Sequence, residues 1–495
     1  MEQTGISSII PIIVTLALSL STRNVVLGLF AGALSGVLMI NGPNLFDSFG
    51  VMVKDYLVPQ LMDGYNAGVI VLLAFIGGFV ALMEQSGGGH AFALKAARRV
   101  GSKRGAQISA WIGGVFIFFS DLGTPLIVGP VFRPLFDKLK VSRQKLAFII
   151  DSTASPVAIL IPFIGWGVYI MGLLQKEFTA LNMDVSGYDA FIGAIPFQFY
   201  AILAVAIVPL LAFYQIDFGP MAGAESDAMR GIAHGNTETT SIPFTHKNAK
   251  ASFVWAPILV MGTVLLIMLG PLGFPFHRVS GSIFRAALSS AYFCASVALI
   301  ALMACCRVRS PSDGVDVYLK GMGNMMRVAI ILVLAWTLNS VSKELGAAAY
   351  IAEQARAGFP ACLVPAVAFL FSAIISFATG SSWGTFAIMT PLVISTSHAI
   401  DAPLFACIGG VLSGGLFGDH CSPISETTIL SSTGSGCDQF EHFRTQFPYA
   451  LLNGGVALTG FLLAGYLQSS LLFVAAIATQ TFLVLILARR RRVPT

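Results

Sequence analysis

The apolar run 403–430 limits most strongly what this chain can fold into, because it is long enough to cross a bilayer and still carries charge at its centre. About 20 apolar residues in a helix span the hydrocarbon core. The centre of this run reads Gly418-Asp419-His420-Cys421-Ser422-Pro423-Ile424-Ser425-Glu426-Thr427-Thr428. An acid at the bilayer centre costs roughly 2.5–3.5 kcal/mol on insertion scales, so such residues usually mark an ion or proton path.

We expect this run to form two half-helices instead of one straight helix. Ser422-Pro423 has the composition of a helix start, an N-cap followed by proline at the first helical position. Gly418 has the residue type of a helix end. A helix broken at membrane depth exposes carbonyl groups from one half and amide groups from the other, which is typical of transporter binding sites.

The composition extends this membrane assignment to the whole chain. Its 495 residues are 56% hydrophobic and only 11% charged, which predicts a polytopic membrane protein. The net charge of +5 comes from basic residues in short loops, so it indicates topology and gives no reason to expect a nucleic-acid partner. The seven cysteines are scattered without zinc-ligand spacing, and we expect them to be reduced.

A second interrupted run lies in the first half of the chain. Residues 107–132 are apolar but broken around Asp121-Leu122-Gly123-Thr124, and both flanks are basic. Because basic clusters mark the cytoplasmic side, we expect a re-entrant hairpin that enters from there, with a single kinked span as the alternative. The next span, 146–174, is interrupted by Asp151-Ser152-Thr153-Ala154-Ser155-Pro156.

The second half repeats this order. The run 361–397 is interrupted by Gly380-Ser381-Ser382-Trp383-Gly384-Thr385, and the broken span 403–430 follows it. Gly123-Thr124 and Pro130 match Gly384-Thr385 and Pro391 at one common offset. The flanks of this second hairpin carry few basic residues, which suits entry from outside. The two halves are therefore predicted to be inverted repeats, as in secondary transporters.

We thus expect an all-α polytopic membrane protein with about eleven transmembrane helices and two re-entrant hairpins, in two inverted repeats with discontinuous helices. The first spans, 7–21 and 25–41, flank Arg23. Loop charges place the N-terminus outside and the C-terminus in the cytoplasm, and the scaffold spans would allow a homodimer. The expected units are N-terminal spans with an interfacial segment (1–64), the first repeat (65–215), a cytoplasmic linker (216–250), linking scaffold spans (251–326), the second repeat (327–468), and a last span with a basic tail (469–495).

Oxygen-bearing residues near the breaks form the candidate site, because a hard cation such as Na⁺ prefers carboxylate, hydroxyl and carbonyl ligands. Within it, the expected Na⁺ ligands are Asp151, Ser155, Asp419, Ser422 and Glu426. The full set of ion- or substrate-binding candidates is Asp121, Gly123, Thr124, Asp151, Ser152, Ser155, Gly380, Ser381, Ser382, Thr385, Asp419, His420, Ser422, Ser425 and Glu426.

The two motifs around Asp419 and Ser381 resemble those of the NhaC-type sodium/proton antiporter family, within the larger ion-transporter superfamily. The resemblance covers most of the chain and implies an inner-membrane protein that exchanges Na⁺ for H⁺. Some relatives of that family move organic acids or other small solutes. Two positions depart from the family pattern: Glu426 stands where Asp is usual, and Asp121 adds a carboxylate at the first hairpin tip.

Three functions remain to be compared. The first is Na⁺/H⁺ antiport, in which Asp419 and Glu426 hold either ion, with no cofactor beyond the transported ions. The second is Na⁺- or H⁺-coupled transport of a small organic solute such as a carboxylate or amino acid. The core shows no clear arginine, since Arg285 and Arg327 are expected near span ends, and this favours a cation. The third, a membrane-embedded enzyme, is disfavoured because adjacent Asp419, His420 and Cys421 point in different directions.

Overall fold

The computed structural model describes residues 5–97, 100–231, 246–273, 279, 281–356 and 358–490. Within these ranges every regular element is a helix, which confirms the all-α class. The centre of the predicted linker (232–245) and the basic residues Arg98, Arg99, Arg491 and Arg492, on which the predicted topology partly depends, lie outside the described residues.

Six helices in the described part of the chain are long and apolar enough to cross a membrane, and there are up to eight if each of two bent pairs is one span. One bent pair joins α2 (Val25–Asn41) to the segment Leu45–Met62 at 106°, and the other joins Gly187–Phe197 to α13 (Phe199–Tyr214) at 48°. The six are α5 (Gly64–Gln85), α15 (Ser252–Leu269), α16 (Gly281–Cys305), α17 with α18 (Pro311–Asn324, Met326–Glu344), α20 (Val364–Thr379) and α24 (Gln439–Leu467).

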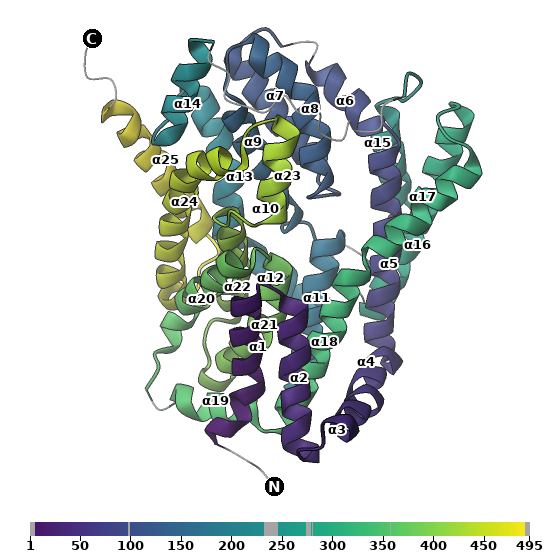
Figure 1. Cartoon of the computed structure of the whole chain (residues 1–495), viewed down its shortest axis with the longest axis vertical. Helices are drawn as coiled ribbons and strands as arrows, with labels where there is room; N and C mark the ends of the chain where they lie inside the picture. The colour runs from purple at the N-terminus through teal and green to yellow at the C-terminus, as the bar shows by residue number, and fades with distance from the viewer. Residues whose placement is uncertain are drawn as a thin grey trace.

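Shorter helices complete the molecule around these spans (Figure 1). The segment Leu45–Met62 contains α3 (Leu45–Val51), a π-helical turn and α4 (Val58–Met62), and its sharp angle to α2 suits the expected interfacial segment. The others outside the two hairpins and broken spans are α6 (Gly88–Ala97), α12 (Gly187–Ala194), α14 (Pro220–Met229), α19 (Ala347–Arg356) and α25 (Leu472–Arg490).

The N-terminal helices reach only the centre of the molecule. With its preceding 3₁₀ turn, α1 (Ile10–Thr22) covers Ile6–Thr22, which is shorter than the six spans above. Figure 1 shows α1 and α2 side by side in the lower half, with their shared turn at about mid-height. Arg23 ends α1 in the left-handed region, at a φ of 54°, and so occupies this central turn.

Each predicted hairpin run contains two helices separated by a break. The first holds α7 (Lys103–Phe116) and α8 (Gly123–Lys138), and the second holds α20 and α21 (Ser382–Ile400). The helices within each pair pack against each other. In Figure 1, α7 and α8 lie in the upper half of the molecule, whereas α20 and α21 lie in the lower half.

Both predicted broken spans are also divided. In the first, α9 (Arg143–Asp151) is followed by the single turn α10 (Ser155–Ala158) and then by α11 (Gly165–Ala180). In the second, α22 (Leu404–His420) is followed by α23 (Glu426–Ser435). The upper half of Figure 1 holds α9 and α23, and the lower half holds α11 and α22.

The predicted bounds of the second break are wrong by two or three residues. The new helix begins at Glu426 with Ser425 as its N-cap, not at Ser422-Pro423. The hydroxyl of Ser422 instead donates to the Phe377 carbonyl at 2.8 Å, which joins the connecting segment to α20. The preceding helix continues past Gly418 to His420.

Close packing explains why a glycine occurs at position 418 within α22. Gly410, Gly414 and Gly418 recur every four residues and face α20. A Cβ at Gly414 would lie 2.2 Å from the Phe369 carbonyl oxygen, and one at Gly418 would lie 2.3 Å from that of Ala373. Small residues at this spacing let two membrane helices approach until their backbones touch, and they hold the end of α22 in place.

The halves also contact each other in an equivalent way. The second helix of the first hairpin, α8, packs on α23, while α21 packs on α11. Likewise α13 packs on α22, and α24 packs on α9. At the crossing of α8 and α23, a Cβ on Gly129 would lie 2.4 Å from the Gly434 backbone.

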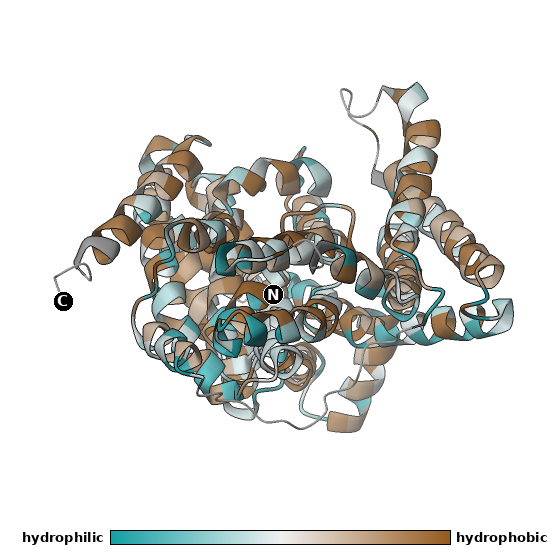
Figure 2. Ribbon diagram, turned by 90° about the horizontal axis from the view of Figure 1, so that it is seen from above, coloured by the Kyte–Doolittle hydropathy of each residue, from teal (hydrophilic) through white to brown (hydrophobic). Residues whose placement is uncertain are grey.

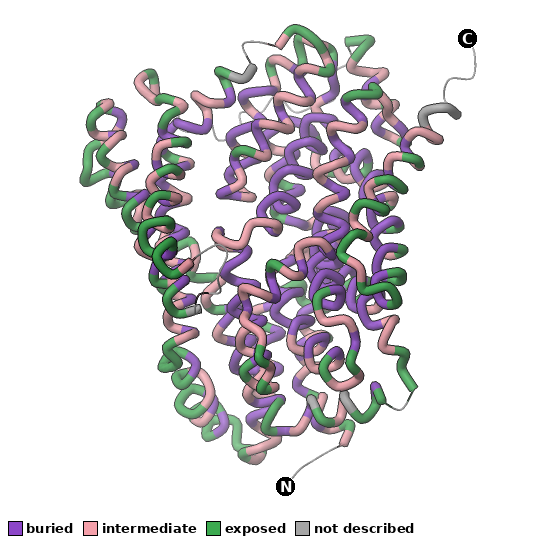
Figure 3. The backbone as a smooth tube through the Cα atoms, turned by 180° about the vertical axis from the view of Figure 1, so that it is seen from behind, coloured by how far each residue is buried: buried purple, intermediate pink, exposed green. Residues whose placement is uncertain are grey.

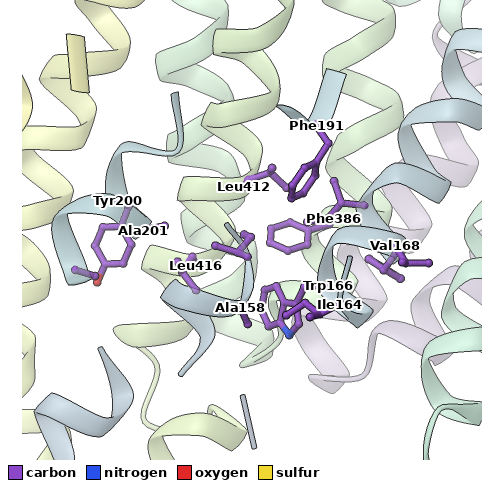
Figure 4. Close-up of a cluster of buried hydrophobic side chains, with 14 of the residues drawn as sticks. Ala158, Ile164, Trp166, Val168, Phe191, Tyr200, Ala201, Phe386, Leu412 and Leu416 are labelled. Atoms are coloured by element: carbon purple, nitrogen blue, oxygen red, sulfur yellow. The ribbon is translucent and has the colours of Figure 1, made fainter. Parts of the chain in front are cut away.

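The buried core lies in the central mass that these helices form, while the scaffold helices leave exposed residues on the periphery (Figure 3). Seen from above, apolar residues also cover much of the outer helices, as expected for a surface in contact with lipid (Figure 2). Figure 4 shows Trp166 of α11 and Phe386 of α21 together with Leu412 and Leu416 of α22, so the core joins both halves.

Candidate central cavity and buried polar cluster

A cavity of about 470 Å³ lies where the breaks of both halves meet. We call it the central cavity. Its charged lining residues are the acids Asp121, Asp419 and Glu426 and the bases Arg23 and Arg327. The tip of the second hairpin, Thr379 to Trp383, and the side chains of Asn324 and Trp166 also line it.

Asp121 lies in the break between α7 and α8, at the tip of the first hairpin. Its Oδ2 accepts a hydrogen bond of 3.1 Å from Trp166 Nε1. The Trp166 ring packs against Trp383, with centroids 4.9 Å apart, so one aromatic pair joins the tips of the two halves. The backbone amides of Asp121 and Leu122 also hydrogen-bond this carboxylate, and a carboxylate with three neutral donors still has a lone pair for a cation.

Asp419 and Glu426 lie on the two sides of the break between α22 and α23. Asp419 occupies the last turn of α22 and accepts a hydrogen bond of 3.2 Å from Thr427 Oγ1. Glu426 is the first residue of α23, and its side chain is exposed towards the cavity. The break therefore presents two carboxylates to one space.

The tip of the second hairpin forms another wall. Gly380 ends α20 at a φ of 64°, a conformation that favours glycine, and a Cβ there would lie 2.8 Å from the Ile424 carbonyl oxygen. Ser381 caps α21 by accepting from the Gly384 amide at 3.3 Å. Ser382 donates to the Gly415 carbonyl at 3.2 Å. These contacts fix the shape of the tip beside the acids.

Two arginines in the cavity correct the expectation that the core lacks them. Arg327 was expected near a span end, but α17 and α18 together form one 34-residue span, so it lies near the middle. Arg23 lies in the central turn between α1 and α2. Neither side chain has a hydrogen bond or ion pair with any residue that the structure describes.

A second polar group, the Asp151 cluster, is fully buried beside the cavity and does not line it. It consists of Asp151, His420, Ser431, His442 and Gln446. Asp151 Oδ2 accepts from Gln446 Nε2 at 2.5 Å and lies 3.6 Å from His442 Nε2, while Oδ1 accepts from Ser431 at 3.3 Å. These residues join α9, α22, α23 and α24.

His420 connects this cluster to the cavity wall, because it follows Asp419 directly. Its Nε2 lies 3.1 Å from the Asp151 backbone carbonyl, which can only accept, so this nitrogen carries a proton. Its Nδ1 lies 3.2 Å from the Tyr200 hydroxyl, which can donate to it. The carbonyl of His420 accepts from Gln446 at 3.0 Å. Both ring nitrogens are thus satisfied, and His420 holds the ends of α9 and α22 together.

The remaining candidate residues lie at the breaks with local roles. Thr124 donates to the carbonyls of Ile117 and Ser120 at 2.9 and 2.8 Å, and Gly123 N donates to Ser120 Oγ, so both close the first hairpin. Thr385 bonds the Ser381 carbonyl, and Ser425 Oγ lies 3.1 Å from Thr427 Oγ1. Ser152 and Ser155 are buried in the first break, where Ser155 Oγ has no partner among the described residues.

The structure therefore divides the five expected Na⁺ ligands among three environments. Asp419 and Glu426 line the cavity, Asp151 belongs to the buried cluster, and Ser155 and Ser422 lie within the two breaks. Within the described residues, no three His, Cys, Asp or Glu side chains converge on one metal position. A sodium ion in the cavity would thus need hydroxyl or carbonyl oxygens in addition to carboxylates.

Sequence reasoning missed Arg23, Arg327, His442 and Gln446. Arg23 follows an apolar stretch that is too short to span a bilayer, which could have indicated a turn at membrane depth. His442 and Gln446 are four residues apart, one helical turn, in the polar stretch before the apolar run 447–468. The structure extends α24 back to Gln439 and so buries both.

Known proteins resemble this chain in sequence and in architecture. Residues 157–466 match the Na⁺/H⁺ antiporter family. An uncharacterized protein of Haemophilus influenzae is 30% identical over 98% of this chain and 95% of its own length. The arginine/ornithine antiporter ArcD of Halobacterium salinarum is 33% identical, but over only 22% of this chain and 23% of its own. The crystal structure of the Alcanivorax borkumensis YdaH transporter superposes with a TM-score of 0.59 at 14% identity, over 84% of this chain and 89% of that one.

Proposed function

Because this chain belongs to the Na⁺/H⁺ antiporter family, we propose that it is a secondary antiporter that exchanges Na⁺ for H⁺ in the central cavity. One observation carries the proposal. Asp121, Asp419 and Glu426, from both halves of the chain, line a single cavity, and none of them has an ion-pair partner among the described residues. Uncompensated acids at membrane depth are costly and usually mark an ion path.

Asp419 is the central residue of this proposal. Its carboxylate accepts hydrogen bonds from Thr427 and Ser425 and retains lone pairs that either a proton or a sodium ion can occupy, but not both at once. Glu426 and Asp121 then complete the negative surface around the ion. Asp151, Ser155 and Ser422 remain predictions from sequence as Na⁺ ligands, and the proposal does not require them.

Alternating access follows from the arrangement of the halves. We propose that residues 65–215 and 327–468 are inverted repeats that expose the cavity to one side and then the other, within about eleven spans and two re-entrant hairpins. The equivalent contacts of α8 with α23 and α21 with α11, and of α13 with α22 and α24 with α9, support this symmetry.

The setting of the protein is part of the same proposal. It would lie in the cell inner membrane with its N-terminus outside and its C-terminus in the cytoplasm, as the basic loops predict. The scaffold helices would allow a homodimer. Transport would need no resident cofactor and no enzymatic step.

The test measures Na⁺-driven proton movement alone. Everted vesicles containing the full chain are loaded with acid and a pH-sensitive dye, and NaCl is added as the sole substrate. We expect the pH gradient to collapse with this chain and to persist with Asp419→Asn. Equal collapse with both proteins, at equal abundance in the membrane, would refute a role for the Asp419 carboxylate in exchange.

A second candidate is coupled transport of a small organic solute. The cavity volume of about 470 Å³ lies within the range of roughly 300–1,000 Å³ that is usual for small-molecule sites, and it exceeds the space that a single sodium ion fills. The short similarity to a protein named as an arginine/ornithine antiporter agrees with this candidate. The same vesicles supplied with amino acids instead of NaCl would distinguish it.

A further inference from the structure

The two arginines of the central cavity require an explanation that Na⁺/H⁺ exchange does not give. A charged arginine at the centre of a membrane span costs roughly 2.5–3.5 kcal/mol on insertion scales. Cation binding gains nothing from such a charge, because like charges repel. Arg23 and Arg327 nevertheless both line the cavity.

Their position shows that they do not simply extend to the membrane surface. Arg327 is the second residue of α18, close to the junction at Met325 that divides the 34-residue span Pro311–Glu344. Arg23 lies in the turn between α1 and α2, and Figure 1 shows the ends of these two helices at about mid-height. Two separate parts of the chain thus bring a guanidinium to the same depth.

The charges within the cavity also do not neutralise one another. No ion pair between either arginine and Asp121, Asp419 or Glu426 occurs in the structure, although all five side chains line one space. Guanidinium groups bind carboxylates through two parallel hydrogen bonds, whereas carboxylates bind ammonium groups and metal cations. The cavity therefore offers unoccupied partners for both signs of charge.

We propose that the central cavity binds a small zwitterion of the amino-acid type, with its carboxylate at Arg23 and Arg327 and its amine at the acids. This inference names the organic solute for the cavity of the proposed function and rests on that cavity. With all five groups ionised, the lining has an excess of one negative charge. One Na⁺ or H⁺ bound together with a zwitterion restores neutrality, so the cation and the organic solute occupy the cavity together.

The aromatic pair supports a solute with an organic body. Trp166 and Trp383 line the cavity, and Tyr169 packs edge-on against Trp383 with centroids 4.7 Å apart. The Tyr169 hydroxyl donates to the Trp383 carbonyl at 2.6 Å, which fixes this wall. A flat apolar wall beside groups of both charges matches a molecule that has a carbon skeleton between its amine and its carboxylate.

The experiment measures ligand-induced stabilisation of the purified full chain in detergent. The twenty common L-amino acids are added singly at millimolar concentration with NaCl present, and the thermal midpoint is recorded. Any amino acid that raises the midpoint is then compared with its decarboxylated amine and its deaminated acid. We expect each analogue to bind at least about 10-fold more weakly than the zwitterion.

Variants locate the site. Arg23→Gln and Arg327→Gln should each weaken zwitterion binding at least about 10-fold, while Arg23→Lys and Arg327→Lys should retain part of it. Arg444→Gln is the matched control, because Arg444 pairs with Glu441 at 3.4 Å on the exposed surface of α24. The unliganded thermal midpoint of each variant shows that it is folded.

The outcomes separate this inference from the function that it extends. If no amino acid stabilises the folded protein while NaCl alone still drives proton movement, the zwitterion site is refuted and Na⁺/H⁺ exchange stands. Unchanged binding in both glutamine variants would also refute it. If a zwitterion binds as expected but Na⁺ drives no proton movement, the inference stands and the proposed Na⁺/H⁺ exchange falls.

Discussion

The central cavity and the Asp151 cluster are built from the same kinds of residue but differ in how their charges are satisfied. Asp151 receives hydrogen bonds from Ser431 and Gln446 and lies beside His442, so both of its carboxylate oxygens have polar partners away from the cavity. Asp419 accepts hydrogen bonds from the neutral hydroxyls of Thr427 and Ser425 but still lines the cavity, and Glu426 has no hydrogen-bond or ion-pair partner among the described residues. A buried acid with many partners stabilises a junction, whereas an acid that keeps free lone pairs beside a cavity is available to a ligand.

The largest effect is expected for Asp419→Asn, which tests whether the cavity acid acts in transport and not in stability. We expect Na⁺-driven exchange to fall about 100-fold, because the lost ionic contact is worth about 2–3 kcal/mol and each 1.4 kcal/mol is a factor of ten. The thermal midpoint should hardly change. Asp401→Asn is the control, since Asp401 is exposed and ends α21 at a φ of 53°, which Asn tolerates. If the Asp419→Asn variant unfolds, Asp419 has a structural role like that of Asp151.

The reciprocal change, Asp151→Ala, should act on stability first. It leaves Gln446, Ser431 and His442 without their shared partner, and each buried polar group that loses its hydrogen-bond partner costs about 1–3 kcal/mol. We expect a large drop in the thermal midpoint and in the yield of monodisperse protein from size-exclusion chromatography. Asp151→Asn, which keeps the shape and one acceptor oxygen, should lose less. Full stability of the alanine variant would contradict a structural role for the cluster.

Gly414→Val should affect both regions together, because α22 carries Asp419 and His420 on its last turn. The new Cβ would lie 2.2 Å from the Phe369 carbonyl oxygen, so α22 must move away from α20. Such overpacking typically costs about 1–3 kcal/mol. The thermal midpoint and the exchange rate should both decrease. Gly455→Ala is the control, because a Cβ there meets open space.

The smallest effect is expected for Trp166→Phe. This change removes the one side-chain donor to Asp121 among the described residues, leaves the backbone amides of the tip in place, and keeps most of the aromatic contact with Trp383. One hydrogen bond to a buried charge is worth about 1.5 kcal/mol at the lower end, so the apparent affinity for the transported ion should change about 10-fold without loss of fold. Trp111→Phe, whose indole donates to the Val205 carbonyl at 3.0 Å, is a matched change at another site and should leave ion affinity unaltered.

The sequence predicted the helical class and the places where helices break, because polar residues and proline within apolar runs leave few other solutions. Its prediction that the second half-helix starts at Ser422-Pro423 was wrong, since Ser422 bonds Phe377 of another helix and α23 begins at Glu426. Local sequence carries the propensity for a break, and the tertiary contact decides which residue begins the next helix.

The candidate site was predictable in part for a similar reason. Asp121, Asp419 and Glu426 stand out because each carboxylate lies in an apolar run. Arg23 and Arg327 do not, because an arginine at the end of an apolar run usually marks the membrane surface. Only the packing of α1, α2 and α18 brings these two side chains to the cavity. His442 and Gln446 are buried because α24 begins at Gln439, before the apolar run from which the sequence predicted this span.

The contact of Gly380 with Ile424 has a mechanical consequence. A Cβ at position 380 would lie 2.8 Å from the Ile424 carbonyl oxygen, so no side chain separates the hairpin tip from the segment that connects α22 to α23. If the halves expose the cavity alternately, as proposed above, these two backbone segments must move together. A zwitterion bound as proposed, between the acids and the two arginines, would connect this unit to the α1–α2 turn and to α18.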